Sequence, residues 1–171
     1  MFIKLIFSLK NEKILGAQIV GIDGVDKRID TIGVAMRLGA KARDLKDLEL
    51  AYAPPYSSAK DPVNMVGFVA ENILTGLVKQ APYDVVNKDP SAFLLDVREP
   101  QELLIYAIPK AKNIPLGELR DRLSELNKED RIIVFCAIGV RAYTAARILM
   151  QNGFKNVEIY PGGVAFYKIN F

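Results

Sequence analysis

The sequence contains no histidine and only one cysteine, Cys136. Without histidine, the chain cannot use Ser-His-Asp or Cys-His catalysis or bind a metal ion through imidazole ligands. A single cysteine excludes an intramolecular disulfide and a metal site made of several thiolates. Any activation of Cys136 must therefore come from backbone dipoles and cationic side chains.

The chain also has few features of nucleic-acid-binding or membrane proteins. Its formal net charge is only +3, and lysine and arginine are scattered rather than collected in a basic run, so nothing favours nucleic acid as a partner. The apolar stretch 1–7 is too short to span a bilayer and lacks the cleavage pattern of a signal peptide. We expect a cytoplasmic protein without a membrane partner, whose thiol is kept reduced.

The 171 residues, half of them hydrophobic, are enough for one ordinary domain or two small ones. The first part predicts an α+β unit. Its expected elements are strands at 2–7 and 14–21, a helix capped by Asp26 that runs through Gly39, a short turn at 45–50 and a helix from Pro62 to Lys79. So long an apolar helix has too little partner surface in a unit of this size, which predicts a dimer or a piece of a larger chain.

A joint near residues 80–83 separates this part from one in which strands and helices alternate. The expected elements are strands at 93–97, 131–135 and 157–160, an extended piece at 108–114, and helices that begin at Pro100, at Pro115 and after Cys136. Unbroken apolar strands that alternate with helices predict a small α/β domain with a central parallel sheet. Ligands of such sheets bind at the carboxyl ends of the strands, where Asp96 and Cys136 lie.

The loop Cys136-Ala137-Ile138-Gly139-Val140-Arg141 joins an apolar strand to a helix. Inward backbone N–H groups, the positive end of the helix dipole and the charge of Arg141 all favour a reactive thiolate. The other interpretation is that Cys136 is a small buried hydrophobe.

Four residues separate Cys136 from Arg141, whereas cysteine phosphatases have five. The shorter loop suits one additional sulfur atom, as in a Cys136 persulfide, better than a tetrahedral oxyanion. A phosphatase or arsenate reductase stays an alternative, as does a non-catalytic dimerisation or docking module that retains an inactive loop.

Residues 81–171 resemble the rhodanese family of sulfurtransferases. The resemblance rests on Leu95–Glu99, Asn113–Pro115, the loop from Cys136 to Arg141, and Pro161–Gly163. It implies that Cys136 carries sulfur, cradled by Ala137, Ile138, Gly139, Val140 and Arg141, with thiosulfate, polysulfide or a persulfide as donor and a thiol as acceptor. It further implies that Asp96 and Arg98 form a supporting pair near the site; a structural ion pair at the strand end is the alternative to direct catalysis.

Residues 1–80 resemble the dimerisation domain of pyridine nucleotide-disulfide oxidoreductases, in the branch of coenzyme A-disulfide reductase and NADH oxidase. The resemblance rests on residues 14–21, 26–30, 52–57 and 61–64. It implies a homodimer, and it implies that Tyr56 points toward a disulfide site across the dimer; the alternative is a turn tyrosine packed on the proline-rich loop.

No Gly-x-Gly-x-x-Gly motif is present, so we expect no cofactor in this chain. FAD, NAD(P)H and coenzyme A are implied only for a full-length parent. The predicted function is rhodanese-type sulfur transfer through Cys136, linked to reduction of coenzyme A-disulfide, polysulfide or persulfide by a flavin half absent from this chain.

Overall fold

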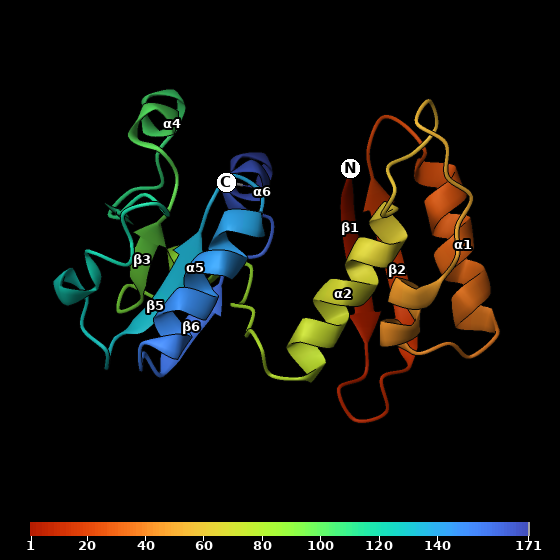
Figure 1. Ribbon diagram of the computed structural model, residues 1–171, viewed down its shortest axis with the longest axis horizontal. Coiled ribbons are helices and arrows are strands. Elements are labelled where there is room, and N and C mark those ends of the chain that lie inside the picture. Colours follow the sequence, from red (N-terminus) through yellow and green to blue (C-terminus); the bar gives the residue numbers. More distant parts are fainter. Residues whose placement is uncertain (171) are drawn as a thin grey trace. The chain divides into compact units, whose positions relative to one another are not determined.

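The computed structural model describes residues 1–170 and divides into two compact units, residues 1–76 and 77–171 (Figure 1). The first unit is α+β and the second contains a parallel sheet with helices, so the predicted fold class is confirmed. The domain boundary expected between residues 80 and 81 lies close to this division and stays a prediction.

The first unit is a two-stranded hairpin covered by two helices (Figure 1). Strands β1 (Phe2–Phe7) and β2 (Ile14–Val20) pair antiparallel, with Phe2 opposite Val20. Helix α1 (Val25–Arg37), a 3₁₀-helix at Ala42–Asp47 and helix α2 (Pro62–Leu74) follow. Alternate residues of β1 pack inward on a buried cluster made of Ile14, Ile32, Ala35, Ala42, Leu45, Val63 and Ala70.

Both helices of the first unit differ at their ends from the prediction. Helix α1 begins after Gly24 rather than at an Asp26 cap, and it ends at Arg37 rather than Gly39. Helix α2 ends at Leu74 rather than Lys79, because Gly76 adopts a left-handed conformation with φ 72°. The chain beyond Gly76 belongs to the second unit, where the carbonyl of Lys79 accepts the N–H of Ile159.

A buried ion pair fixes the proline-rich loop of the first unit. Arg28 on α1 donates to both carboxylate oxygens of Asp61, at 2.9 and 3.3 Å, and the hydroxyl of Ser57 donates to the same carboxylate. Asp61 also caps α2 by accepting the N–H of Val63. Burial raises the pKa of Asp61, but the bonds from Val63 and Arg28 outweigh it and the pKa is lowered. The loop between Tyr52 and Asp61 is therefore anchored at its end by charge-assisted hydrogen bonds.

The second unit is a four-stranded parallel sheet in the order β4-β3-β5-β6. Its strands are β3 (Phe93–Asp96), β4 (Lys112–Asn113), β5 (Arg131–Phe135) and β6 (Asn156–Ile159). Its helices are α3 (Val85–Lys88), α4 (Pro100–Ile105), α5 (Val140–Gln151) and α6 (Gly163–Asn170), of which α3 and α6 were not expected.

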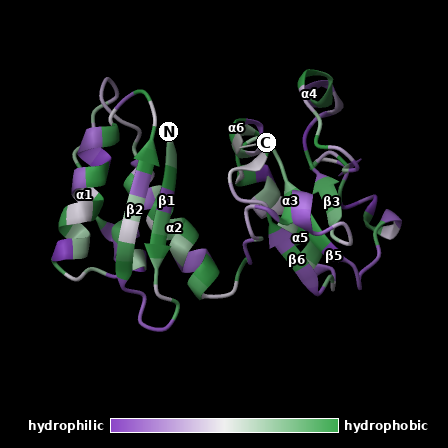
Figure 2. Ribbon diagram, turned by 180° about the vertical axis from the view of Figure 1, so that it is seen from behind, coloured by the Kyte–Doolittle hydropathy of each residue, from purple (hydrophilic) through white to green (hydrophobic). Residues whose placement is uncertain are grey.

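The sheet is buried on both faces, as parallel sheets require. Strands β3 and β5 are coloured hydrophobic over most of their length in Figure 2. Ile133 and Phe135 of β5 belong to a cluster with Tyr160, Val164 and Tyr167, and the alternate β5 residues are equally buried. Over residues 1–170, no helix combines the length and apolarity needed to cross a membrane.

The helix predicted from Pro115 does not form. Residues 115–126 instead make successive i→i+3 turns and a short 3₁₀-helix at Leu123–Glu125. The N–H of Leu116 donates to the carbonyl of Val97, which ties the start of this segment to the end of β3. Gly117 also disfavours a helix here, because glycine loses more backbone entropy than other residues when it becomes helical.

Candidate functional site

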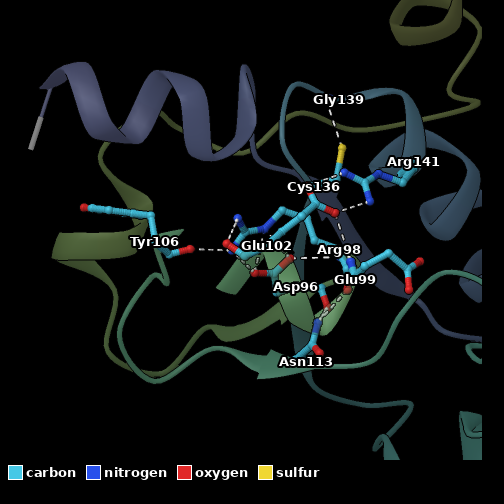
Figure 3. A network of polar contacts seen from close by, with 9 residues as sticks. All are labelled: Asp96, Arg98, Glu99, Glu102, Tyr106, Asn113, Cys136, Gly139 and Arg141. Atoms are coloured by element: carbon cyan, nitrogen blue, oxygen red, sulfur yellow. Dashed lines mark hydrogen bonds and ion pairs between the residues drawn. The ribbon is translucent and has the colours of Figure 1, made fainter. Parts of the chain in front are cut away.

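Cys136 follows β5 directly and therefore lies at the carboxyl end of the central sheet (Figure 3). The residue is buried, with 1% of its surface exposed, and its Sγ accepts the N–H of Gly139 at 3.1 Å. Gly139 has φ 142°, a conformation that L side chains rarely adopt, and it leads into α5. The first turn of α5 thus follows the thiol immediately and adds the positive end of its dipole.

Helix α6 holds the loop from behind. The N–H groups of Val164 and Ala165 donate to the carbonyls of Cys136 and Ala137, at 2.9 and 3.0 Å. Gly163 permits this approach, because a Cβ at this position would collide with the Cys136 carbonyl oxygen. These two hydrogen bonds tie the beginning of the loop to the first turn of α6.

Arg141 connects the thiol to a carboxylate on α4. Its guanidinium donates two parallel hydrogen bonds to Glu102, at 2.6 and 2.8 Å, and it also interacts with Cys136 (Figure 3). The hydrogen bonds from Arg141, with a smaller contribution from the N–H of Glu99, lower the pKa of Glu102 to about 2. The same pairing raises the pKa of Arg141. At neutral pH, both groups are therefore charged.

Glu102 was not among the residues singled out in the sequence. A glutamate three residues after Glu99, with Pro100 at the helix start, is typical of a capping box, and Glu102 does accept the N–H of Glu99. This motif could have drawn attention to the residue, but it gives no indication of its second partner, Arg141.

Asp96 and Arg98 form a buried pair at the end of β3. The carboxylate accepts three hydrogen bonds from the Arg98 side chain, the shortest 2.6 Å, and one from the Arg98 backbone. Arg98 also donates to the carbonyl of Tyr106, so the pair connects β3 to the end of α4. Asn113 donates to the carbonyls of both residues. Asp96 and Arg98 thus bond to each other, to neighbouring backbone and to the Asn113 side chain, and a direct part of the pair in a reaction stays a prediction.

A cysteine in a strand-to-helix loop closed by arginine is what the rhodanese resemblance implied. Residues 82–169 match the family model of the rhodanese-like domain. The chain belongs to the rhodanese-like family. The motifs of the rhodanese-like domain now have a structural reason: the Cys136 loop ends the central strand, and Gly163 lets α6 support that loop.

Residues 1–62 match the model of the pyridine nucleotide-disulphide oxidoreductase dimerisation domain, so both parts of the recognition are confirmed. Neither matched model is a flavin- or nicotinamide-binding domain. Among residues 1–170, no group of three or more histidine, cysteine, aspartate or glutamate side chains could hold a metal ion.

The curated relatives named here match less than half of this chain. A coenzyme A disulfide reductase of Staphylococcus aureus is 42% identical over 71 residues, which are 42% of this chain and 16% of that protein. The putative sulfur carrier protein YrkF of Bacillus subtilis is 44% identical over 78 residues, which are 45% of this chain and 42% of that protein.

Two solved structures match nearly the whole chain. Reduced Bacillus anthracis CoADR-RHD has 50% identity and a TM-score of 0.92, covering 96% of this chain and 30% of that one. A NAD-dependent persulfide reductase from A. fulgidus has 41% identity and a TM-score of 0.86, with the same coverage. The chain thus spans about a third of these structures and less of the curated reductases.

The remaining predicted site residues differ in their surroundings. Ile138 and Val140 of the rhodanese-like loop are 67% and 69% exposed, so both aliphatic side chains face solvent. Tyr56 belongs to the other unit, lies in a turn in which its N–H donates to the carbonyl of Ala53, and is 82% exposed. It is therefore not packed on its own loop, and its contribution across a dimer stays a prediction.

Proposed function

We propose that the chain is a rhodanese-type sulfurtransferase that carries sulfane sulfur as a persulfide on Cys136. The observation that carries the proposal is the pairing of Sγ with the Gly139 N–H and with Arg141 at the end of β5. Both donors stabilise negative charge at the sulfur, which a thiolate nucleophile and a persulfide product share. The proposed step uses no histidine, a residue that the chain lacks.

In the proposed reaction, the Cys136 thiolate attacks the outer sulfur of a persulfide, polysulfide or thiosulfate donor. A bond forms between Sγ and that sulfur, the donor's sulfur–sulfur bond breaks, and the remainder leaves with the bonding electron pair. An acceptor thiolate then attacks the outer sulfur of the Cys136 persulfide and restores the Cys136 thiolate. The hydrogen bond from the Gly139 N–H to Sγ supports a role of the loop amides in holding the transferred sulfur.

The relatives suggest the setting of this transfer. Their printed names include coenzyme A disulfide reductase and persulfide reductase, and we infer that a parent of this chain couples Cys136 to such a reduction in a flavin half. The dimerisation-domain match and the exposed apolar side chains of Phe2, Ile6 and Val20 on the hairpin support a homodimer. A dimer would present Tyr56 to the partner subunit, and a reducing compartment such as the cytoplasm would keep Cys136 available.

Intact-protein mass spectrometry tests the sulfur-carrier function directly. After incubation with a persulfide donor, the protein is expected to gain about 32 Da, and the gain should disappear in Cys136→Ser and after reduction with dithiothreitol. Because Cys136 is the only cysteine, the gain has one possible thiol site.

A non-catalytic docking module would behave differently. It would show no mass gain with any donor, and its thiol would react with iodoacetamide no faster than a free thiol at neutral pH. A mass gain on Cys136 with fast alkylation supports the sulfur carrier, whereas no mass gain with slow alkylation supports the docking module.

A further inference from the structure

We propose that Glu102 is a positioning residue for Cys136. It restrains the Arg141 guanidinium beside Sγ and takes up part of its positive charge, so that the thiolate is stabilised only in part. The inference rests on the proposed sulfur-transfer function and names how the reactivity of its thiol is set. Its basis is that one guanidinium serves two anions, the thiolate that follows β5 and the carboxylate on α4 (Figure 3).

The Glu102 carboxylate has a fixed place from which to hold Arg141. Arg141 donates to its two oxygens at 2.6 and 2.8 Å, and the Glu99 N–H donates to one of these oxygens at 3.0 Å. The second contact ties the carboxylate to the start of α4. Because the bonds from Arg141 are bidentate, they fix the plane of the guanidinium, which a single contact with Sγ could not do.

The cations of this site are paired with carboxylates. Arg141 pairs with Glu102, and Arg98, whose charge also acts on Glu102, pairs with Asp96. The ionised Glu102 opposes the effect of Arg141 on the Cys136 thiolate, because a like charge nearby disfavours the charged form of a group. About a third of each side chain of the Arg141–Glu102 pair is exposed, so solvent reduces this effect without removing it.

A partly stabilised thiolate suits a residue that both takes up and releases sulfur. A more strongly stabilised thiolate forms at lower pH, but it attacks more slowly and leaves more readily. Loading requires the Cys136 thiolate to attack the outer sulfur of the donor. Discharge requires it to leave with the bonding pair when an acceptor thiolate attacks the outer sulfur of the persulfide. Once the thiol is ionised, Glu102 therefore makes loading faster and discharge slower.

Alkylation of Cys136 by iodoacetamide tests this role without any sulfur donor. Glu102→Gln removes the charge but keeps the length of the side chain and an oxygen acceptor for the Glu99 N–H. Its alkylation rate is expected to rise about threefold at about pH 6, where more thiol is ionised than in wild type, and to fall about threefold at about pH 9, where the thiolate is less nucleophilic. Glu102→Ala should change both rates in the same directions. Glu102→Asp keeps the charge and should restore both rates to values close to wild type.

Glu125→Gln is the matched control in the same unit. Like Glu102, Glu125 accepts two hydrogen bonds from one arginine, Arg122, at 2.6 and 3.0 Å, and these bonds lower its pKa to about 2. Its other cationic partner is Lys112 on β4. Both alkylation rates of Glu125→Gln should equal those of wild type.

A merely structural role for Glu102 predicts the opposite change at acidic pH. Loosening of the loop would make the thiol resemble a free one and would lower the acidic rate instead of raising it. A lower or unchanged acidic rate in both Glu102→Gln and Glu102→Ala would overturn the positioning role.

Sulfur transfer is measured separately, with a persulfide donor and an acceptor thiol. At alkaline pH, Glu102→Gln is expected to load Cys136 about threefold more slowly than wild type and to discharge it faster. If wild-type Cys136 takes up no sulfur while the alkylation rates change as expected, the proposed function fails and the positioning role of Glu102 stands.

Discussion

Single residues around Cys136 place two positively polarised groups against the sulfur, and neither of them is a histidine. The Gly139 N–H and Arg141 both direct positive charge to Sγ, while Glu102 fixes the guanidinium from the other side. Because the Glu102 bonds are bidentate, Arg141 has a defined orientation rather than the freedom of a surface side chain. The carboxylate therefore contributes geometry, and it removes part of the positive charge that Arg141 would otherwise present.

The sequence could predict only part of this arrangement. Cys136, Gly139 and Arg141 are adjacent in the chain, so their spacing and their place between a strand and a helix indicate a loop that surrounds the sulfur. Glu102 is separated from Arg141 by 39 positions, and nothing in the local pattern of α4 identifies its distant partner. Such a contact depends on the sheet order, which places β3 beside β5.

The Glu102 carboxylate should make protein stability dependent on pH. Its pKa is about 2 in the folded protein, below the ordinary value of 4.5. A lowered folded pKa contributes stability that is present above about pH 4.5 and is lost as the pH falls toward about 2. Urea midpoints measured across this window should decline more steeply for wild type than for Glu102→Gln. Parallel declines in the two proteins would contradict the pairing. Glu129→Gln is the control, because it removes an exposed ion pair with Lys155, and its urea midpoints should decline as those of wild type do.

Helices and strands differ in how well the chain predicts them. Strands β3 and β5 are apolar runs that need no distant information, and both lie where the pattern predicts them. The leucines of 115–126 have helical spacing, yet this segment forms i→i+3 turns, and Gly117 within it disfavours a helix. Helix α6 was missed because Pro161-Gly162-Gly163 indicates a turn. Of its two glycines, Gly163 is the one that allows α6 to contact the Cys136 loop.

The support of the loop by α6 predicts a strong effect of Gly163→Ala. Gly163 has φ 58°, and a Cβ there would collide with the backbone of Cys136 and Ala137. We expect a loss of about 2 kcal/mol or more in the free energy of unfolding, together with slower sulfur loading of Cys136, because the loop carbonyls lose their donors. Urea unfolding and the loading rate measure the two effects.

Gly117→Ala is the matched control for this substitution. Gly117 lies in the same unit, and nothing within 4 Å would meet its Cβ. The control should stay within about 0.5 kcal/mol of wild type and load sulfur normally. A Gly163→Ala protein that also behaves like wild type would show that α6 does not determine the loop geometry.

The whole molecule consists of two units, each of which buries an ion pair. The Arg28–Asp61 pair lies in residues 1–76, between α1 and the start of α2, while Gly139 and Arg141, the partners of the Cys136 thiol, belong to the unit that begins at Leu77. The length and composition of the chain allow one ordinary domain or two small ones, and they could not show that a buried charge pair lies in the first unit. Such a pair is costly to break, because the remaining charge stays buried without a partner.

This separation predicts that the stability of the first unit can be lowered without loss of sulfur loading on Cys136. Arg28→Met leaves the buried Asp61 without its cation and should cost about 3 kcal/mol, whereas Arg43→Met breaks a partly exposed pair with Glu12 and should cost less than about 1 kcal/mol. Hydrogen exchange resolved by mass spectrometry should show faster exchange in residues 1–76 of Arg28→Met, with residues 77–170 and the loading of Cys136 unchanged. If loading of Cys136 falls together with protection of the first unit, the rhodanese-like domain depends on its neighbour for stability, and the two units do not unfold independently.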